Sequence, residues 1–160
     1  MNTIIVSAMF CCGKTHFCRN QTKYSVIDLE DNFFGSGMCT HAQKEWILRK
    51  SYCQKLRYCL GQYDFIFVAM YQSVLFYLAN HDIPYVLVCP ENTTECFEEW
   101  GRRNVARGTM ALWESCQEHW SETIRLALSD PYAKKVYFLK KDEYLSDVID
   151  RIREECADVW

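Results

Sequence analysis

The chain has 160 residues, of which 49% are hydrophobic and 24% are charged, so it has the length and composition of one globular domain rather than of a disordered segment. Its formal net charge of -3 indicates no basic surface over the whole domain, and we therefore do not expect nucleic acid as a partner. No apolar run is long enough to cross a bilayer and the apolar start lacks a basic leader, so we expect a cytoplasmic protein with no membrane partner.

The first predicted element is a buried strand, and the segment AMFCCGKT (residues 8–15) links it to a helix. In the Walker A phosphate loop, G-x-x-x-x-G-K-S/T, backbone N–H groups surround the phosphates, the Lys reaches the terminal phosphates and the hydroxyl residue binds Mg²⁺. Gly13, Lys14 and Thr15 match this pattern, whereas Ala8 replaces the first Gly. Because a strand precedes the segment and a helix follows it, we predict a phosphate loop that binds ATP or another nucleoside triphosphate with Mg²⁺.

Phe10, Cys11 and Cys12 form the middle of this segment, where such loops usually have small, permissive residues. We predict that all three line the nucleotide site together with the matching residues of the motif. A side chain at position 11 or 12 is strained if the loop requires a positive φ there. A thiol beside Lys14 at a helix N-terminus could have a lowered pKa and be reactive, although we favour two tolerated small residues.

The second predicted strand ends in two carboxylates, Asp28 and Glu30. Side chains alternate along an extended chain, so these two share one side, at the end of the strand that borders the ligand crevice of an α/β sheet. We predict that both are catalytic: Asp28 holds Mg²⁺ together with Thr15, and the pair positions the metal and a substrate hydroxyl. The alternative is that Glu30 and Asp31 are solvated loop acids or cap the element that follows.

The third predicted strand carries Asp64 at its beginning and no acid at its end. The beginning of a strand lies at the opposite edge of the sheet from the predicted phosphate loop. This argues against a motor-type ATPase, which keeps an acid after an apolar strand, and suits a small kinase that places its metal by other means.

A predicted helix over residues 94–107 carries three arginines. Arg103 and Arg107 are four residues apart and share one helical face with Trp100, whereas Arg102 points elsewhere. We predict that Arg103 and Arg107 are catalytic and close over the transferring phosphates as a lid. An ordinary solvated face with salt bridges to neighbouring acids is the alternative.

The alternation of short β-rich runs with helices indicates a parallel sheet with helices on both faces. The predicted strands cover residues 3–8, 24–29, 63–70, 85–89 and 136–139. The first predicted helix begins at residue 14, and the others cover residues 42–60, 73–80, 94–107, a stretch from about 110 to 127, and 143–160. We therefore predict a single domain over residues 1–160, with a three-layer P-loop NTPase fold and a five-stranded parallel sheet.

Local signals refine two of these helices. Helix 42–60 has an apolar stripe at helical spacing and a C-terminal cap at Gly61. The predicted stripe consists of Trp46, Cys53, Leu56 and Leu60. Asn92 with Glu95 predicts an N-cap before helix 94–107. Trp113 and Trp120 are seven residues apart, which favours core packing over stacking on a base.

Ten cysteines are scattered over the predicted elements. We interpret most of them as buried, reduced thiols that pack as small apolar residues. Cys39 with His41, and Cys12 with His16 and Cys18, contain metal-ligating side chains, but their spacing matches no common zinc pattern.

The chain resembles the small P-loop proteins of bacteriophages that are described as kinase-like or ATPase-like. The features that carry this resemblance are Ser7-Ala8, Gly13-Lys14-Thr15, Asp28 with Glu30, residues 63–68, residues 86–90 and Arg107-Gly108. More distantly, it is similar to nucleoside monophosphate kinases and to shikimate and gluconate kinases. That resemblance implies that Asp28 and Glu30 serve the metal and the substrate, and that the lid arginines serve phosphates.

Two functions follow as hypotheses. The first is a Mg²⁺- and ATP-dependent phosphotransferase that acts on a nucleotide or on another small hydroxyl or phosphate acceptor. The second is a P-loop-derived binding or inhibitor protein of viral origin that does no chemistry and acts on a host protein in the host cytoplasm. The many aromatic residues and the irregular loop favour the second hypothesis.

Overall fold

The computed structural model describes residues 2–30 and 51–156 of the chain. In this part, five strands form one sheet in the order β2-β3-β1-β4-β5, and all neighbouring pairs are parallel. The strands are β1 Ile4–Ala8, β2 Val26–Asp28, β3 Phe65–Ala69, β4 Val86–Pro90 and β5 Lys135–Leu139. The predicted α/β fold with a five-stranded parallel sheet is therefore confirmed.

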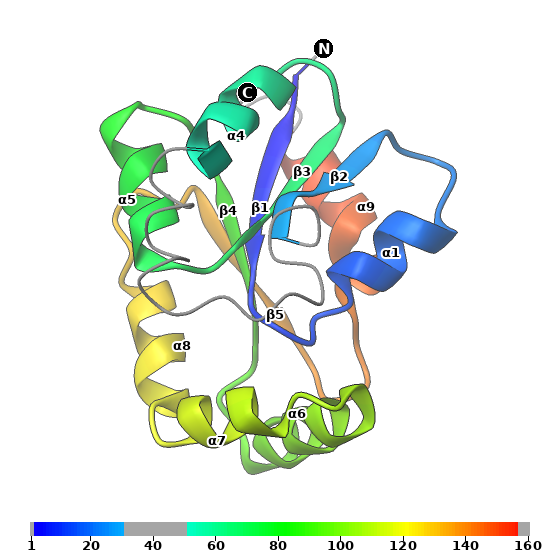
Figure 1. Cartoon of the computed structure of the whole chain (residues 1–160), viewed down its shortest axis with the longest axis vertical. Helices are drawn as coiled ribbons and strands as arrows, with labels where there is room; N and C mark the ends of the chain where they lie inside the picture. Colours follow the sequence, from blue (N-terminus) through cyan, green and yellow to red (C-terminus); the bar gives the residue numbers. More distant parts are fainter. Residues whose placement is uncertain (1, 31–50, 157–160) are drawn as a thin grey trace.

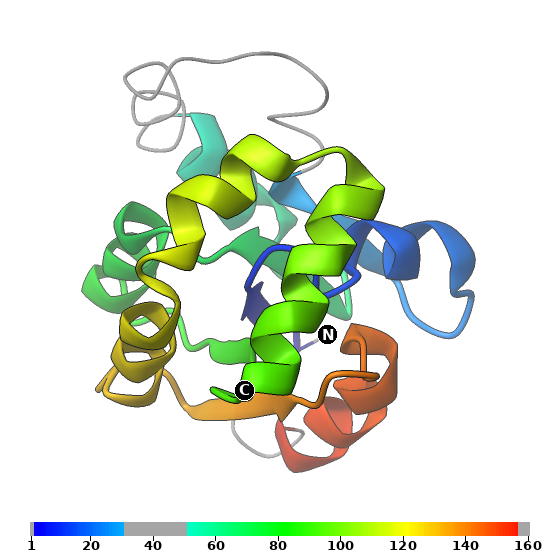
Figure 2. The same cartoon turned by 90° about the horizontal axis from the view of Figure 1, so that it is seen from below.

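Seven helices of the described part flank this sheet. They are α1 Lys14–Asn20, α4 Cys53–Cys59, α5 Gln72–Asn80, α6 Thr94–Arg107, α7 Met110–Gln117, α8 Trp120–Leu128 and α9 Leu145–Cys156. Figures 1 and 2 show α1 and α9 on one face of the sheet and α4, α5 and α8 on the other. Because both faces are covered, every residue of β1, β3 and β4 is buried, which explains why these strands read as continuous apolar runs.

Helix α6 lies across the carboxyl ends of the central strands, as the view from below shows (Figure 2). Its bounds match the prediction at both ends, and Gly108 ends it in a left-handed conformation with φ 74°. The N-cap, however, is Thr93, whose Oγ1 accepts a hydrogen bond from Cys96 N at 3.2 Å. The prediction of Asn92 was wrong by one residue, since its Oδ1 instead accepts a hydrogen bond from Ser121 at 3.0 Å.

The predicted helix from about 110 to 127 is two helices, α7 and α8, with a break at Glu118 and His119. The break brings two indole rings to one place. Trp113 and Trp120 lie 5.8 Å apart and both contact Phe97 of α6, at 5.0 and 5.7 Å between ring centroids. The prediction that both tryptophans pack in the core is confirmed.

Part of the predicted helix 42–60, with Trp46, lies outside the described residues, as do Asp31, Cys39 and His41. Within the described part, Cys53 and Leu56 of the predicted stripe are buried. Leu60 is 36% exposed, so its place in the stripe was wrong. Leu60 follows the last residue of α4 and is already outside the helical conformation, with a ψ of 134°, and Gly61 then takes a positive φ of 77°.

The cysteines behave as small apolar residues. Nine lie in the described part and all nine are free thiols, six of them buried. Among residues 2–30 and 51–156, no three His, Cys, Asp or Glu side chains are placed to share a metal ion. In the same part of the chain, no helix has the length and apolar character that a membrane span needs.

Candidate functional site

The segment between β1 and α1 lies at the carboxyl ends of the parallel strands, beside the end of β2 (Figure 1). Strand β1 is the middle strand of the sheet, with β3 on one side and β4 on the other. Met9 N donates to Val88 O of β4 at 3.0 Å, so the start of this segment is still fixed to the sheet. The carboxyl ends of such strands are where α/β proteins bind ligands.

Lys14 folds back over this segment. Its Nζ donates to Ala8 O at 2.7 Å and to Met9 O at 3.4 Å, and it lies 3.1 Å from Glu30 Oε2. Burial lowers the pKa of Lys14, but the nearby carboxylates of Glu30 and Asp28 outweigh this effect, and the net pKa is raised. Lys14 is therefore a buried, positively charged side chain that is 7% exposed.

Thr15 and Asp28 meet next to this lysine. Thr15 Oγ1 donates to Asp28 Oδ2 at 3.1 Å, and Asp28 Oδ1 accepts a hydrogen bond from Glu30 N at 3.1 Å. Asp28 is 5% exposed. The structure thus brings together four predicted site residues, Lys14, Thr15, Asp28 and Glu30, from the first helix and the end of β2. A hydroxyl and carboxylate oxygens are ligands that suit Mg²⁺.

The carbonyl groups of the loop are bonded on its outer side. Phe10 O accepts a hydrogen bond from Trp100 Nε1 at 2.9 Å, Cys11 O from Arg103 at 3.3 Å, and Cys12 O from the backbone N–H of Leu145 at 2.8 Å. In a trans peptide group the N–H points opposite to the C=O. The N–H groups of residues 11, 12 and 13 therefore point away from these partners.

Two residues of the loop have positive φ angles, Cys11 at 60° and Gly13 at 94°. The strain that the sequence suggested for position 11 or 12 thus falls on Cys11. Gly13 is also restricted by a close neighbour, since a Cβ at this position would lie 3.2 Å from Cδ1 of Tyr144. Both residues give the loop a shape that an ordinary helical turn would not have.

The cysteines of the loop are not activated thiols. Burial raises the pKa of Cys12 to about 12 and also raises the pKa of Cys11, although Arg107, Arg103 and Lys14 act in the opposite direction on Cys11. The suggestion of a lowered pKa was therefore wrong, because burial destabilises the thiolate more than the nearby cations stabilise it. The reading of both as tolerated small residues agrees with this result.

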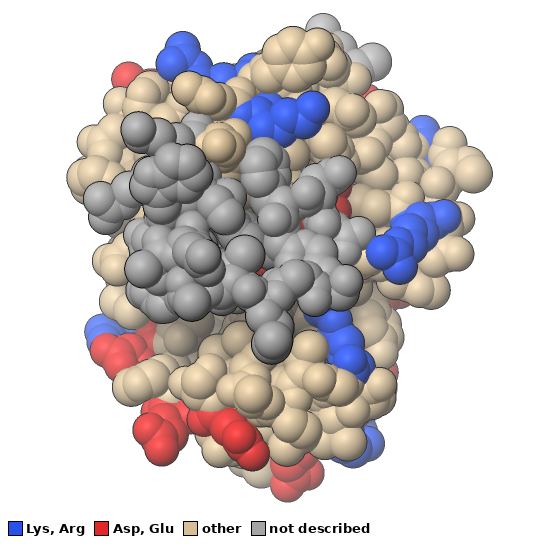
Figure 3. Space-filling view, viewed as in Figure 1, with Lys and Arg blue, Asp and Glu red and all other residues tan. Residues whose placement is uncertain are grey.

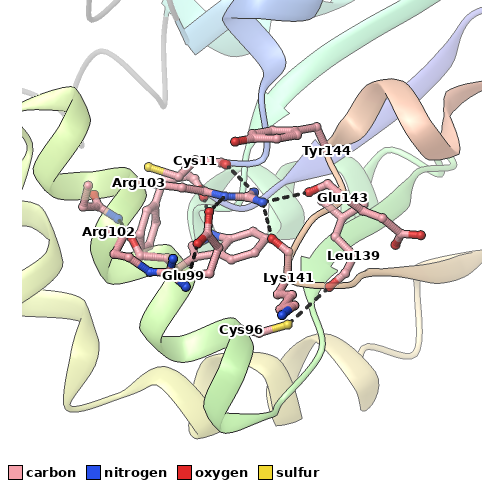
Figure 4. A network of polar contacts seen from close by, with 12 residues as sticks. Cys11, Cys96, Glu99, Arg102, Arg103, Leu139, Lys141, Glu143 and Tyr144 are labelled. Carbon is pink, nitrogen blue, oxygen red and sulfur yellow. Dashed lines mark hydrogen bonds and ion pairs between the residues drawn. The ribbon is translucent and has the colours of Figure 1, made fainter.

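The two predicted lid arginines differ in their surroundings. Arg103 is 9% exposed and is bonded to the outer side of the loop and to the segment between β5 and α9 (Figure 4). Arg107 is exposed at the end of α6, with its guanidinium beside the Cys11 thiol. Arg102 is also exposed and pairs with Glu99 at 3.0 Å. Of the three arginines of α6, Arg107 is therefore the one whose exposed guanidinium lies beside a loop residue.

Asp64 lies at the beginning of β3, as predicted, and is used there for structure. Its carboxylate accepts a hydrogen bond from Ser25 N at 2.8 Å and lies 3.5 Å from Arg153. The end of β3 carries a different group: Tyr52 OH accepts a hydrogen bond from Ala69 N at 3.1 Å. Burial raises the pKa of this tyrosine well above its ordinary range.

Sequence reasoning missed the residues that hold the loop from outside. The position of Trp100 on the same helical face as the two arginines could have indicated its contact with the loop. The sequence gives no such indication for Tyr144 or for the N–H of Leu145, because only the fold brings them to the loop. Tyr71 lies near Glu30, and burial together with that carboxylate raises its pKa to about 12.

Two cavities, of about 660 and 270 Å³, lie elsewhere in the molecule. The larger one is lined by Cys53 and by α5 residues such as Gln72 and Phe76, and no loop residue lines either cavity. Basic side chains form separate small groups over the face seen in Figure 3. The candidate site is therefore identified by the chemistry of its side chains and not by the size of a cavity.

Comparison with family models, with curated proteins and with solved structures finds no match for this chain. The assignment of a function depends accordingly on the arrangement of Lys14, Thr15, Asp28, Glu30 and the loop backbone.

Proposed function

We propose that the chain is a P-loop phosphotransferase, which binds Mg²⁺ and ATP or another nucleoside triphosphate at residues 8–15 and transfers a phosphoryl group to a nucleotide or small hydroxyl or phosphate acceptor. The observation that supports this most strongly is the position of Lys14. Its ammonium lies over the loop at 2.7 Å from Ala8 O, buried beside the acids at the end of β2. A buried cation next to inward N–H groups is what phosphate oxygens require.

The loop and Lys14 would bind the phosphates. The N–H groups of Cys11, Cys12 and Gly13, which point away from their outer partners, would donate to phosphate oxygens. Lys14 would exchange its contact with Glu30 for one with the transferring phosphate and stabilise the charge that develops on it. Hydrogen bonds between charged partners are the stronger kind, so Lys14 should supply much of the affinity.

The oxygens of Thr15 and Asp28 fit a Mg²⁺ ion. The hydroxyl and the carboxylate already lie 3.1 Å apart at the mouth of the loop. Mg²⁺ would neutralise phosphate charge at this place. A cation is needed there for a second reason: the charges of Asp28 and Glu30 exceed that of Lys14 by one, so the acids would otherwise repel a polyphosphate.

Glu30 and Arg107 are the remaining candidates for a direct role. The carboxylate of Glu30 is 30% exposed on the open side of Lys14, from which it could accept the proton of an acceptor hydroxyl. Arg107 is exposed beside the loop and has room to approach a transferring phosphate. We assign no phosphate contact to Arg103, whose guanidinium is bonded to the outer side of the loop.

The test is calorimetric titration of Mg²⁺·ATP into the reduced protein and into the Lys14→Ala variant. We expect the variant to bind at least about 10- to 100-fold more weakly, the equivalent of one lost hydrogen bond to a charged group. Lys23→Ala is the matched control, because Lys23 lies on the surface and pairs with Asp150 at 2.9 Å, away from the loop. Transfer is then tested by ADP release with a panel of nucleotides and small alcohols.

A binding protein without chemistry is the second candidate. Exposed apolar side chains on the helices outside the loop favour it: Val105 is 59% exposed, and Met110 and Leu112 are each 40% exposed. If the folded protein gives no heat with millimolar Mg²⁺·ATP, the phosphotransferase proposal is wrong and a protein partner should be sought.

A further inference from the structure

The phosphate loop has a conformational weak point at Cys11. Its φ of 60° is left-handed, a region in which the Cβ of a non-glycine residue approaches the following carbonyl oxygen at a cost in free energy. The peptide group after Cys11 also directs the N–H of Cys12. Whatever holds Cys11 O in place therefore decides whether this N–H points into the loop.

Arg103 holds that oxygen from the outer side of the loop. Its Nη1 donates to Cys11 O at 3.3 Å, and its Nη2 donates to Glu143 O at 3.1 Å and to Lys141 O (Figure 4). A single guanidinium on α6 thus joins the loop to the segment between β5 and α9. These three pieces of chain are far apart in the sequence.

The guanidinium itself is fixed in position. Its Nε donates to Glu99 Oε1 at 3.1 Å, which pairs the buried charge. Its carbon atom lies 4.2 Å from the ring centroid of Trp100 and 3.9 Å from that of Tyr144, so it is stacked between two aromatic rings. Tyr144 in turn contacts Gly13, the other residue of the loop with a positive φ.

This arrangement leaves Arg103 little capacity to bind a ligand. A guanidinium has five N–H groups, and four of them donate to protein oxygens here. A lysine could not replace it, because the compact ammonium lacks the planar fork that reaches several fixed oxygens at once.

We infer that Arg103 is a positioning residue, which keeps the strained peptide group of Cys11 in the conformation that binds phosphate. The inference rests on the proposed function of the loop and explains how Phe10, Cys11 and Cys12 can replace permissive residues. Contacts from outside the loop hold a backbone conformation that a glycine within the loop would adopt without strain.

The first test is the affinity of the full-length Arg103→Lys variant for Mg²⁺·ATP, measured by calorimetry. We expect a loss of about 10- to 100-fold, since a charged hydrogen bond to the loop is removed. Arg102→Lys is the matched control: Arg102 is the adjacent residue and pairs with the same Glu99, but it is 71% exposed. Its affinity should equal that of the unmodified protein.

The decisive test is rescue by a second substitution. Gly adopts a positive φ without strain, so Cys11→Gly added to Arg103→Lys should recover about five- to tenfold of the lost affinity. An arginine that contacted phosphate directly, or that only supported the global fold, would not be replaced by a glycine at position 11. Absence of rescue, including failure to restore folding if Arg103→Lys alone does not fold, would overturn the inference.

Amide hydrogen exchange of residues 10–13 without nucleotide separates the two proposals. We expect faster exchange in Arg103→Lys than in Arg102→Lys. If the unmodified protein does not bind Mg²⁺·ATP, the proposed function fails and the exchange rates still test the positioning of the loop. If it binds, but Arg103→Lys changes neither affinity nor exchange, the inference is wrong and the proposed function stands.

Discussion

At the scale of single residues, the shape of the candidate site depends on two backbone conformations. Cys11 and Gly13 both have positive φ angles, yet they differ in what accompanies them. Cys11 carries a side chain and is held by Arg103, whereas Gly13 lies against the ring of Tyr144. The second residue is the one at which a side chain would meet both strain and a neighbour.

We expect Gly13→Ala to lower the free energy of unfolding by about 1–3 kcal/mol, because the new Cβ adds a contact with Tyr144 to the strain of a positive φ. Urea denaturation measures this. Gly61→Ala is the matched control: Gly61 has φ 77°, but nothing lies within 4 Å of an added Cβ. Equal losses in the two variants would show that the contact with Tyr144 has no effect.

At the scale of elements, α6 is the helix on which the site depends. It crosses the carboxyl ends of the strands (Figure 2), and it supplies Trp100 and Arg103 to the outer side of the loop and Arg107 to its mouth. Trp100 is completely buried, and its indole N–H is bonded to Phe10 O at 2.9 Å. Helix and loop are therefore coupled by specific hydrogen bonds as well as by apolar contact.

We expect Trp100→Phe to destabilise the protein by about 1–2 kcal/mol more than Trp120→Phe, as measured by urea denaturation. Both substitutions remove a similar buried volume. Only the first removes a hydrogen bond and leaves the partly buried carbonyl of Phe10 without this donor, at a cost of about 1–3 kcal/mol. Trp120 Nε1 has no partner among the described residues. Trp100→Phe should also weaken Mg²⁺·ATP binding. A larger loss in Trp120→Phe would contradict this account of α6.

At the scale of the whole molecule, buried thiols link stability to pH. Burial raises the pKa of Cys89 and of Cys12 from an ordinary value of 9.0 to about 12, and that of Cys53 to about 11. Below the ordinary value, these thiols are protonated in both the folded and the unfolded chain. Above it, only the unfolded chain releases the protons, so the unfolded state gains stability as the pH rises.

We therefore expect the free energy of unfolding to fall between pH 8.5 and pH 10, by up to about 1.4 kcal/mol per pH unit for each such thiol. Urea denaturation of the reduced protein at several pH values measures the slope. Cys89→Ala should reduce this slope by the contribution of one thiol, which is up to about 1.4 kcal/mol per pH unit. An unchanged slope in this variant would mean that Cys89 ionises equally in both states.

The sequence was sufficient to place those residues of the candidate site whose positions follow from adjacent elements of the chain. Lys14 and Thr15 followed from a strand, a loop and a helix in succession, and Asp28 with Glu30 from the end of the next strand. The role of Arg103 did not follow, because its acceptors Cys11 O and Glu143 O are brought to it only by the fold. Local pattern could place this arginine on a helical face but could not say what that face would meet.

The errors in the predicted elements have the same cause, namely contacts between residues that are distant in the sequence. Thr93 and Asn92 are both good capping residues. Thr93 caps α6, whereas the side chain of Asn92 accepts a hydrogen bond from Ser121, which only the fold brings near it. The break between α7 and α8 allows Trp113 and Trp120 to reach Phe97, a contact that no helical period within 110–127 reveals.

In the proposed mode of binding, the backbone N–H groups of Cys11, Cys12 and Gly13 bind phosphate together with Lys14. The most direct measurement is a titration of Mg²⁺·ATP into ¹⁵N-labelled protein, in which the amide resonances of residues 11–14 are followed. We expect the largest shifts at these residues and expect them to disappear in Lys14→Ala. Shifts confined to other residues, or none at millimolar Mg²⁺·ATP, would contradict it.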